Sequence, residues 1–236
     1  MSADTLALGL IWFVAFLFSS TCHEAAHAWA AKRGGDETAY AAGQVSLNPV
    51  PHMRREPFGM LVMPWLSYIM GGWMMGWASA PYDPYWARRH PRRSAWMALA
   101  GPAANFALAI FAAILIHIGI LLNVFRLTGQ FSDRFDQLVG GTSLGVPAGA
   151  AAFLSILFAL NVLLGTFNLL PVPPLDGFNV LGIFLSDEAG LKLMNLRDSL
   201  GAMSILGLLI AWRYAGEVII PALFFATSNL LYLPYR

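Results

Sequence analysis

The chain has 236 residues, of which 58% are hydrophobic and only 11% are charged. Soluble globular domains carry about 25% charged residues, so this composition excludes an ordinary soluble enzyme. It also excludes an intrinsically disordered chain, which needs low hydrophobicity and high net charge. The formal net charge of +1 gives no support for nucleic-acid binding. We therefore expect an integral membrane protein.

Five apolar runs follow one another along the chain. A helix that spans a bilayer needs about 20 mostly apolar residues, and the last run is long enough for two helices because Arg213 and Glu217 flank a possible turn at Gly216. We predict an all-α polytopic membrane protein with five to six membrane segments. The runs cover residues 6–31, 58–79, 95–122, 148–170 and 200–233.

The first run contains a pattern typical of a metal site. It lacks proline and includes His23, Glu24 and His27. Residues four apart lie on one face of a helix, so the two imidazoles converge on one point and the carboxylate can reach a water there. This is the arrangement of a zinc-dependent hydrolase, with the glutamate as general base. A carboxylate within a membrane segment is unfavourable by about 2.5–3.5 kcal/mol, which argues against an idle match.

Two histidines leave the site incomplete, because a catalytic zinc takes three protein ligands. His52, His90, His117 and a few carboxylates are the candidates for the third. Asp176 stands out, because it follows the run 148–170 after three prolines that end the helix. Irregular backbone at membrane depth occurs where it lines a cavity or is buried in protein. Taken alone, the Asp-Gly pair is more typical of an interfacial turn, but together with the histidine pair it favours a ligand.

Several further motifs accompany the histidine pair. These are Gly101-Pro102-Ala-Ala-Asn105, Asn161, Asn168-Leu-Leu-Pro-Val-Pro-Pro-Leu-Asp176-Gly177, and Gly43-Gln-Val-Ser-Leu-Asn48-Pro49 followed by His52 and Phe58-Gly59. In this combination the sequence resembles the site-2 protease family of intramembrane zinc metalloproteases, over roughly residues 15–185. The segment after the histidine helix looks like that of compact bacterial and archaeal members.

The resemblance implies an endopeptidase that cleaves membrane-embedded helices of other proteins, in a prokaryotic cell membrane. It implies one Zn2+ per chain, held by His23, His27 and Asp176, with Glu24 as catalytic base. The expected partners are a membrane-spanning protein substrate and the lipid bilayer, without nucleic acid. We expect a single metalloprotease domain over 1–236, with a catalytic core at about 6–185, C-terminal membrane helices at 186–236, and no PDZ or CBS module. An acidic residue often follows His52 in the family, but Met53-Arg54 follows here, so His52 receives no role.

A shared metal constrains the topology. His23 and His27 lie near the end of the first run, and Asp176 lies just after 148–170, so these two helices must run parallel. An odd number of crossings must therefore separate them, although two apolar runs intervene. The run 58–79 contains Pro64 and a Gly-Gly pair, which favour a reversal. We predict that 58–79 forms a re-entrant or broken hairpin.

The basic residues support this topology. With 58–79 re-entrant, eight lysines and arginines fall on one side of the membrane against Arg126 and Arg134 on the other. The positive-inside rule makes the crowded side cytoplasmic, so we expect the active site toward the cytoplasm. The eight are Lys32, Arg33, Arg54, Arg55, Arg88, Arg89, Arg92 and Arg93.

Two supporting features are also predicted. Asn105 and Asn161 are candidates for stabilising the oxyanion of the transition state, or else for structural hydrogen bonds between helices. The segment 36–50 fits a short β-hairpin that turns near Ala42-Gly43, whose edge could pair with an unwound substrate; a plain interfacial loop is the alternative.

Two other functions use some of the same residues. A membrane metal-binding or transport protein could employ the histidine pair, but transporters place ionisable residues along a path through several helices. An inactive protease homologue acting as a scaffold is a further alternative, and the intact Glu24 argues against it. The sequence leaves the oligomeric state open.

Overall fold

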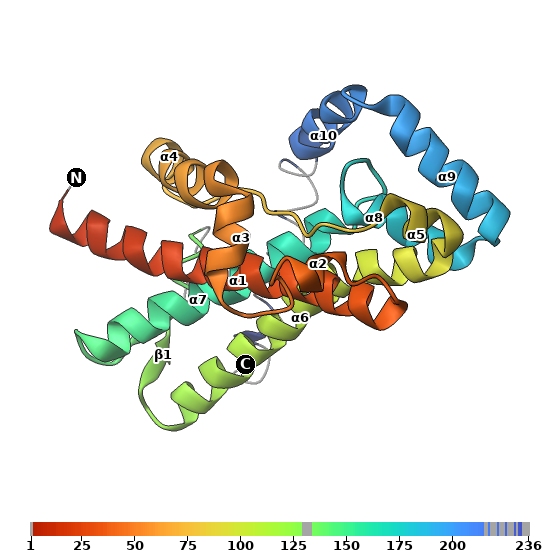
Figure 1. The fold of residues 1–236 in the computed structure, drawn as a ribbon. Coiled ribbons are helices and arrows are strands. Elements are labelled where there is room, and N and C mark those ends of the chain that lie inside the picture. The colour runs from red at the N-terminus through yellow and green to blue at the C-terminus, as the bar shows by residue number, and fades with distance from the viewer. Residues whose placement is uncertain are drawn as a thin grey trace.

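The computed structural model describes residues 2–128, 134–214, 217, 221, 225, 229, 231 and 232. It is mainly helical, and its elements follow in chain order (Figure 1). These are α1 (Ala3–Gly34), α2 (Thr38–Ala41), α3 (Pro49–Arg55), the π-helix η1 (Phe58–Val62), α4 (Met63–Gly71), α5 (Pro84–Arg89), α6 (Pro91–Leu121), β1 (Phe125–Leu127), β2 (Val139–Gly141), α7 (Val146–Asn168), α8 (Asp176–Val180), the 3-10 helix η2 (Leu181–Phe184), α9 (Asp187–Leu200) and α10 (Met203–Tyr214).

Three helices among the described residues, α1, α6 and α7, are long and apolar enough to cross a membrane, with 32, 31 and 23 residues. They form the centre of the molecule and pack against one another. Figure 1 shows α1 and α7 running in the same direction, with α6 running in the opposite one. The predicted parallel arrangement of the first and fourth runs is therefore present in the structure.

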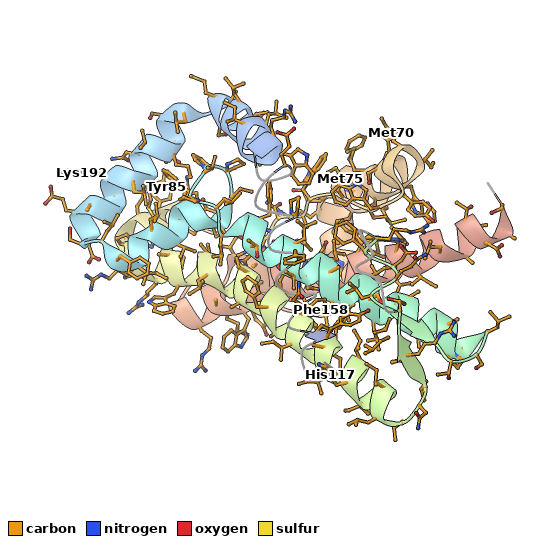
Figure 2. The ribbon with its side chains drawn as sticks, turned by 180° about the vertical axis from the view of Figure 1, so that it is seen from behind. Met70, Met75, Tyr85, His117, Phe158 and Lys192 are labelled. Carbon is orange, nitrogen blue, oxygen red and sulfur yellow. The ribbon has the colours of Figure 1, made fainter. Side chains whose placement is uncertain are left out.

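Two apolar clusters hold these helices together. One lies between α6 and α7 and includes Ala112, Ile116 and Phe158; the small alanine allows close approach of the two helices. The other joins α1 and α7 through Trp12 and Phe16. In Figure 2, Phe158 lies within the helical bundle, whereas Met70, which is 80% exposed, lies on the outer side of α4.

The run 58–79 is broken, as predicted. Its helical part, Phe58–Gly71, is shorter than a span. The helix ends where Gly72 takes the left-handed φ of 76°, which favours glycine, and the chain then continues to Asp83 without regular structure. Gly76 packs directly on Gly59: a Cβ at Gly76 would lie 2.1 Å from the Gly59 carbonyl oxygen. A side chain at either Gly59 or Gly76 would prevent this backbone contact.

The β-hairpin predicted for 36–50 is wrong. This segment contains the short helix α2 and the start of α3. Local hydrogen bonds decide the outcome. Asp36 Oδ1 accepts from the backbone and hydroxyl of Thr38 in a turn ahead of α2, and Asn48 caps α3 ahead of Pro49. The two-stranded antiparallel sheet of the structure lies elsewhere, between α6 and α7, with Phe125 opposite Gly141.

The C-terminal part begins with α9 and α10, which meet at an angle of 97°. If this bent pair counts as one span, the described residues contain up to four spans, so the predicted five to six membrane segments are not all present among them. The helix α10 covers only the first part of the run 200–233, and the turn predicted at Gly216 lies outside the described residues.

Candidate metal centre

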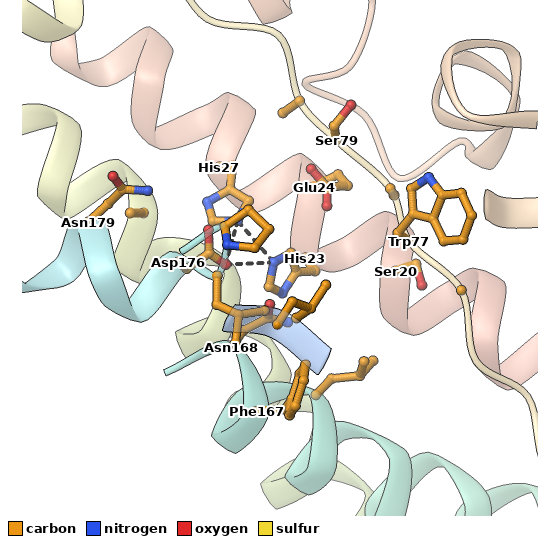
Figure 3. A pocket seen from close by; sticks show the side chains of 18 of the residues that line it. Ser20, His23, Glu24, His27, Trp77, Ser79, Phe167, Asn168, Asp176 and Asn179 are labelled. Atoms are coloured by element: carbon orange, nitrogen blue, oxygen red, sulfur yellow. Dashed lines mark hydrogen bonds and ion pairs between the residues drawn. The ribbon is translucent and has the colours of Figure 1, made fainter. Parts of the chain in front are cut away.

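Two imidazoles and one carboxylate meet where the end of α1 lies against the start of α8. His23 Nε2 and His27 Nε2 are 2.9 Å apart, and Asp176 Oδ2 lies 3.1 Å from the first and 3.2 Å from the second. Figure 3 shows the three side chains pointing toward one another. The structure thus brings together the three residues that the sequence analysis selected as ligands. Within the described part of the chain, His52, His90 and His117 belong to no such group.

Local structure explains how each element presents its side chain. The four-residue spacing places His23 and His27 on one face of α1. Asp176 is the first residue of α8, which starts tightly against the end of α7. A Cβ on Gly177 would lie 2.2 Å from the Leu169 carbonyl oxygen, so the Asp-Gly pair is the sequence that permits this approach. The ordinary-turn interpretation of Asp176-Gly177 misses this packing role.

The helix α6 supplies the wall behind the imidazoles. Met97, Gly101 and Asn105 lie four residues apart along it, and therefore on one face. His27 Nδ1 is 2.7 Å from the Met97 carbonyl oxygen, and His23 Nδ1 is 2.6 Å from Asn105 Oδ1. Between these contacts, a Cβ on Gly101 would lie 2.3 Å from His27 Nε2 and 2.6 Å from His23 Nε2. The space at the centre of the site depends on this glycine.

The donor set fits zinc. Both Nδ1 atoms are occupied by contacts to α6, so both Nε2 atoms face Asp176 Oδ2. A proton placed among these three atoms satisfies one contact at a time, whereas a cation satisfies all three. Two histidines and one carboxylate form a known catalytic zinc ligand set, and ligand atoms on a tetrahedral zinc are about 3.3 Å apart, close to the spacing observed.

The electrostatics of Asp176 agree with an ionised ligand. Burial raises the pKa of its carboxyl, but the neighbouring imidazoles of His27 and His23 lower it by more, so the pKa lies below its ordinary value. The carboxylate is therefore charged at neutral pH. Since carboxylate ligands bind metal in the deprotonated form, Asp176 is already in the required state.

A cavity of about 1060 Å³ opens beside these residues, at the upper end of the size of small-molecule sites. Glu24 lines it and is only 6% exposed, yet its carboxylate accepts no hydrogen bond from the residues that the structure describes. Figure 3 shows Glu24 on the same side of α1 as His23 and facing the segment that carries Trp77 and Ser79. A general base needs access to water in the cavity, and Glu24 has this position beside the two imidazoles and Asp176.

The two asparagines predicted to support the reaction lie outside the cavity that a substrate would enter. Asn105 and Asn161 are both fully buried, and neither lines the cavity. Asn105 touches His23 instead, and Asn161 touches Asn105. The amides that do line the cavity belong to Asn168 and Asn179 (Figure 3).

The sequence analysis did not identify the extended segment 73–82 as part of the site. All ten of its residues line the cavity. Ser79 ties the segment to α3, since its hydroxyl donates to Glu56 Oε1 at 2.5 Å and accepts from Arg55 Nε at 3.0 Å. The available signal was negative: after the Gly71-Gly72 break this apolar stretch has neither helical nor alternating periodicity.

Comparison with known proteins agrees with this geometry. The profile of peptidase family M50, the site-2 proteases, matches residues 11–211. The chain belongs to this family. It is 31% identical over 171 residues to "Putative zinc metalloprotease YwhC" of Bacillus subtilis, covering 71% of the present chain and 66% of that protein. No solved structure matches the chain.

Further relatives are also named as zinc metalloproteases. "Putative zinc metalloprotease Rip2" of Mycolicibacterium smegmatis is 30% identical over 196 residues, which cover 80% of the present chain and 64% of that protein. Rip2 of Mycobacterium tuberculosis strain H37Rv is 33% identical over 173 residues, covering 73% and 56%. The present chain therefore spans about two thirds, or less, of the length of these relatives.

Proposed function

We propose that this M50 protein is an intramembrane zinc endopeptidase that cleaves membrane-embedded helices of other proteins. The observation that carries the proposal is the convergence of His23 Nε2, His27 Nε2 and Asp176 Oδ2 within 2.9–3.2 Å, beside a cavity that Glu24 lines. These three residues hold one zinc ion per chain, and Glu24 is the general base. The apolar helices that surround the site favour a substrate that reaches it from the bilayer.

Each catalytic residue has a defined task in this reaction. A zinc ion held by His23, His27 and Asp176 would supply Lewis acidity to acidify water and polarise the scissile carbonyl. Glu24 takes a proton from the attacking water and returns it to the amine that leaves when the peptide C–N bond breaks. Asn168, whose amide lines the same cavity, is placed to donate a hydrogen bond to the carbonyl oxygen as negative charge develops on it.

The extended segment 73–82 is the candidate for holding the substrate backbone. A helical substrate must unwind before its carbonyl reaches the ligands, and an unwound stretch needs new hydrogen-bond partners. Among the described residues, the backbone amides of Ala78, Ser79 and Ala80 donate to none. Pairing with this extended backbone replaces the role that the sequence analysis gave to 36–50.

The orientation in the membrane follows from the basic residues. Trp86 Nε1 and Arg93 Nη1 both donate to the Gly34 carbonyl, so the basic ends of α1 and α6 lie together, while Arg126 lies in β1 beyond the far end of α6. Under the positive-inside rule, this arrangement supports an orientation with the metal centre toward the cytoplasm. Thiol labelling of Cys variants at 36–50 and 82–93 in intact cells tests this; labelling from opposite faces contradicts it.

The catalytic proposal is tested with purified protein in lipid vesicles and a single-span peptide that contains a central helix-breaking Asn-Pro pair. Wild type should contain one zinc per chain and cleave the peptide. Glu24→Gln should keep the zinc and lose about 10²–10⁴-fold in rate, the usual contribution of a general base. Asp176→Asn should lose zinc itself. Full cleavage by Glu24→Gln excludes the mechanism.

A further inference from the structure

A chain of buried hydrogen bonds leads away from His23 through three helices. His23 Nδ1 contacts Asn105 Oδ1 at 2.6 Å, and Asn105 Nδ2 donates to Asn161 Oδ1 at 2.7 Å. Asn161 Nδ2 then donates to Ser19 Oγ and to the Leu157 carbonyl oxygen, both at 2.8 Å. Ser19, Asn105 and Asn161 are all 0% exposed, so water offers none of them an alternative partner.

The far end of this chain fixes its direction. The Leu157 carbonyl only accepts, so the atom of Asn161 beside it must be the NH2 group. Ser19 agrees, because its hydroxyl proton is donated to the Ala15 carbonyl at 2.7 Å, which leaves its oxygen to accept. The oxygen of Asn161 therefore faces Asn105, and both Asn161 protons are used.

The same reasoning passes on to the histidine. Asn105 must turn its NH2 group toward Asn161 Oδ1, so its own oxygen faces His23 Nδ1. An oxygen there requires a proton on Nδ1, and in a neutral imidazole this leaves the lone pair on Nε2. That is the atom that lies 3.1 Å from Asp176 Oδ2. The backbone carbonyl of Leu157 thus determines which nitrogen of His23 is available to a metal.

We propose that Asn161 and Asn105, anchored by Ser19 and the Leu157 carbonyl, form a one-directional relay that holds His23 as its Nδ1–H tautomer. They are positioning residues, since neither reaches the cavity. Met97 performs the equivalent task for His27 through one backbone carbonyl. His23 Nδ1 instead contacts the side chain of Asn105 on α6. An asparagine amide with no second partner can turn either its oxygen or its NH2 group toward the ring. The second asparagine removes that freedom. The relay rests on the proposed zinc site.

The zinc affinity of Asn161 variants tests the relay, because Asn161 is connected to the ligand His23 only through Asn105. In Asn161→Leu, the Asn105 amide loses the partner that orients it, and zinc affinity measured against a competing chelator should fall about 10–100-fold, the range for lost outer-shell partners. Asn161→Asp is the matched rescue, because a neutral carboxyl donates to the Leu157 carbonyl and still accepts from Asn105. It should bind zinc much more tightly than Asn161→Leu.

A control variant separates the relay from general packing in α7. Ser155 is also 0% exposed and accepts a hydrogen bond from the Val139 backbone, so Ser155→Ala removes an equally buried polar contact outside the relay. Its zinc affinity should equal that of wild type. If Asn161→Leu matches wild type, or if Asn161→Asp is as weak as Asn161→Leu, the relay is excluded while the zinc site stands.

A second measurement reads the tautomer without metal. In chelator-treated protein labelled with ¹⁵N-histidine, the His23 signal, identified by its loss in His23→Gln, should show a protonated Nδ1 at alkaline pH. A protonated Nε2 in wild type overturns the relay even where Asn161→Leu does not fold. Failure of wild type to bind zinc instead overturns the proposed function, because the tautomer readout does not depend on zinc.

Discussion

Replacing Gly101 by alanine tests the geometry of the metal centre most directly. The added Cβ would lie 2.3 Å from His27 Nε2 and 2.6 Å from His23 Nε2, whereas ordinary contacts begin near 3.4 Å. Both imidazoles must therefore move by roughly 1 Å, while metal–ligand distances tolerate only about 0.2 Å. Moving α6 away instead breaks the contacts of Met97 and Asn105 with the rings. We expect zinc affinity to fall at least 100-fold, beyond the usual loss for an outer-shell partner.

The assay is a zinc titration of chelator-treated protein in detergent, followed by cleavage in vesicles. Gly149→Ala is the matched control, because Gly149 lies within α7 and a Cβ there meets nothing within 4 Å. Removing a glycine from a helix leaves the fold unchanged or slightly more stable, so zinc binding should equal that of wild type. Wild-type zinc affinity in Gly101→Ala would refute the placement of the two imidazoles against α6.

Three further outcomes are expected. Removing zinc with a chelator should abolish cleavage, and adding zinc back should restore it; cleavage by metal-free protein would contradict the mechanism. Ala78→Pro, which removes a backbone donor from the cavity wall, should reduce cleavage while zinc content stays constant; unchanged cleavage removes segment 73–82 from substrate binding. Asp36→Ala should lower the free energy of unfolding by about 2–4 kcal/mol, because the buried carboxylate accepts hydrogen bonds from Thr38 and from the Asp83 backbone. As a control, Glu188→Ala breaks an exposed ion pair with Lys192 and should change the free energy of unfolding by less than about 0.5 kcal/mol.

The sequence predicted those parts of the site that depend on local geometry. The convergence of His23 and His27 follows from the helical repeat alone. Asp176 was selected by its place after the proline-ended run 148–170 and by the family resemblance, and a metal shared with the histidines then required the first and fourth runs to be parallel. The break of the run 58–79 was visible because Gly71-Gly72 interrupts it. The histidine spacing and the glycine break are each decided within a few residues along the chain. The position of Asp176 depends instead on the requirement that it share one metal ion with the two histidines.

The segments between the spans could not be predicted in this way. The segment 36–50 fitted either a β-hairpin or an interfacial loop, but the side chains of Asp36 and Asn48 each accept a hydrogen bond from a backbone amide two residues on, which favours turns and short helices there. The cavity wall 73–82 takes its course from the contact between Gly59 and Gly76. That contact joins residues 17 positions apart, and no local pattern records it.

Aligning the sequence of α1 with that of α6 in antiparallel order predicts which residues of the two helices face each other. In two antiparallel helices, a ligand pair at i and i+4 on one helix faces positions that run backwards on the other. His27 meets Met97 and His23 meets Asn105, with Gly101 midway. Two of the three positions, Gly101 and Asn105, belong to a motif that the sequence shows, but only Asn105 received a role there, in oxyanion stabilisation or in hydrogen bonds between helices. Placed opposite the histidines, the glycine leaves the space that the proposed zinc requires and the asparagine contacts the His23 ring, so in this proposal α6 builds the site without contributing a ligand.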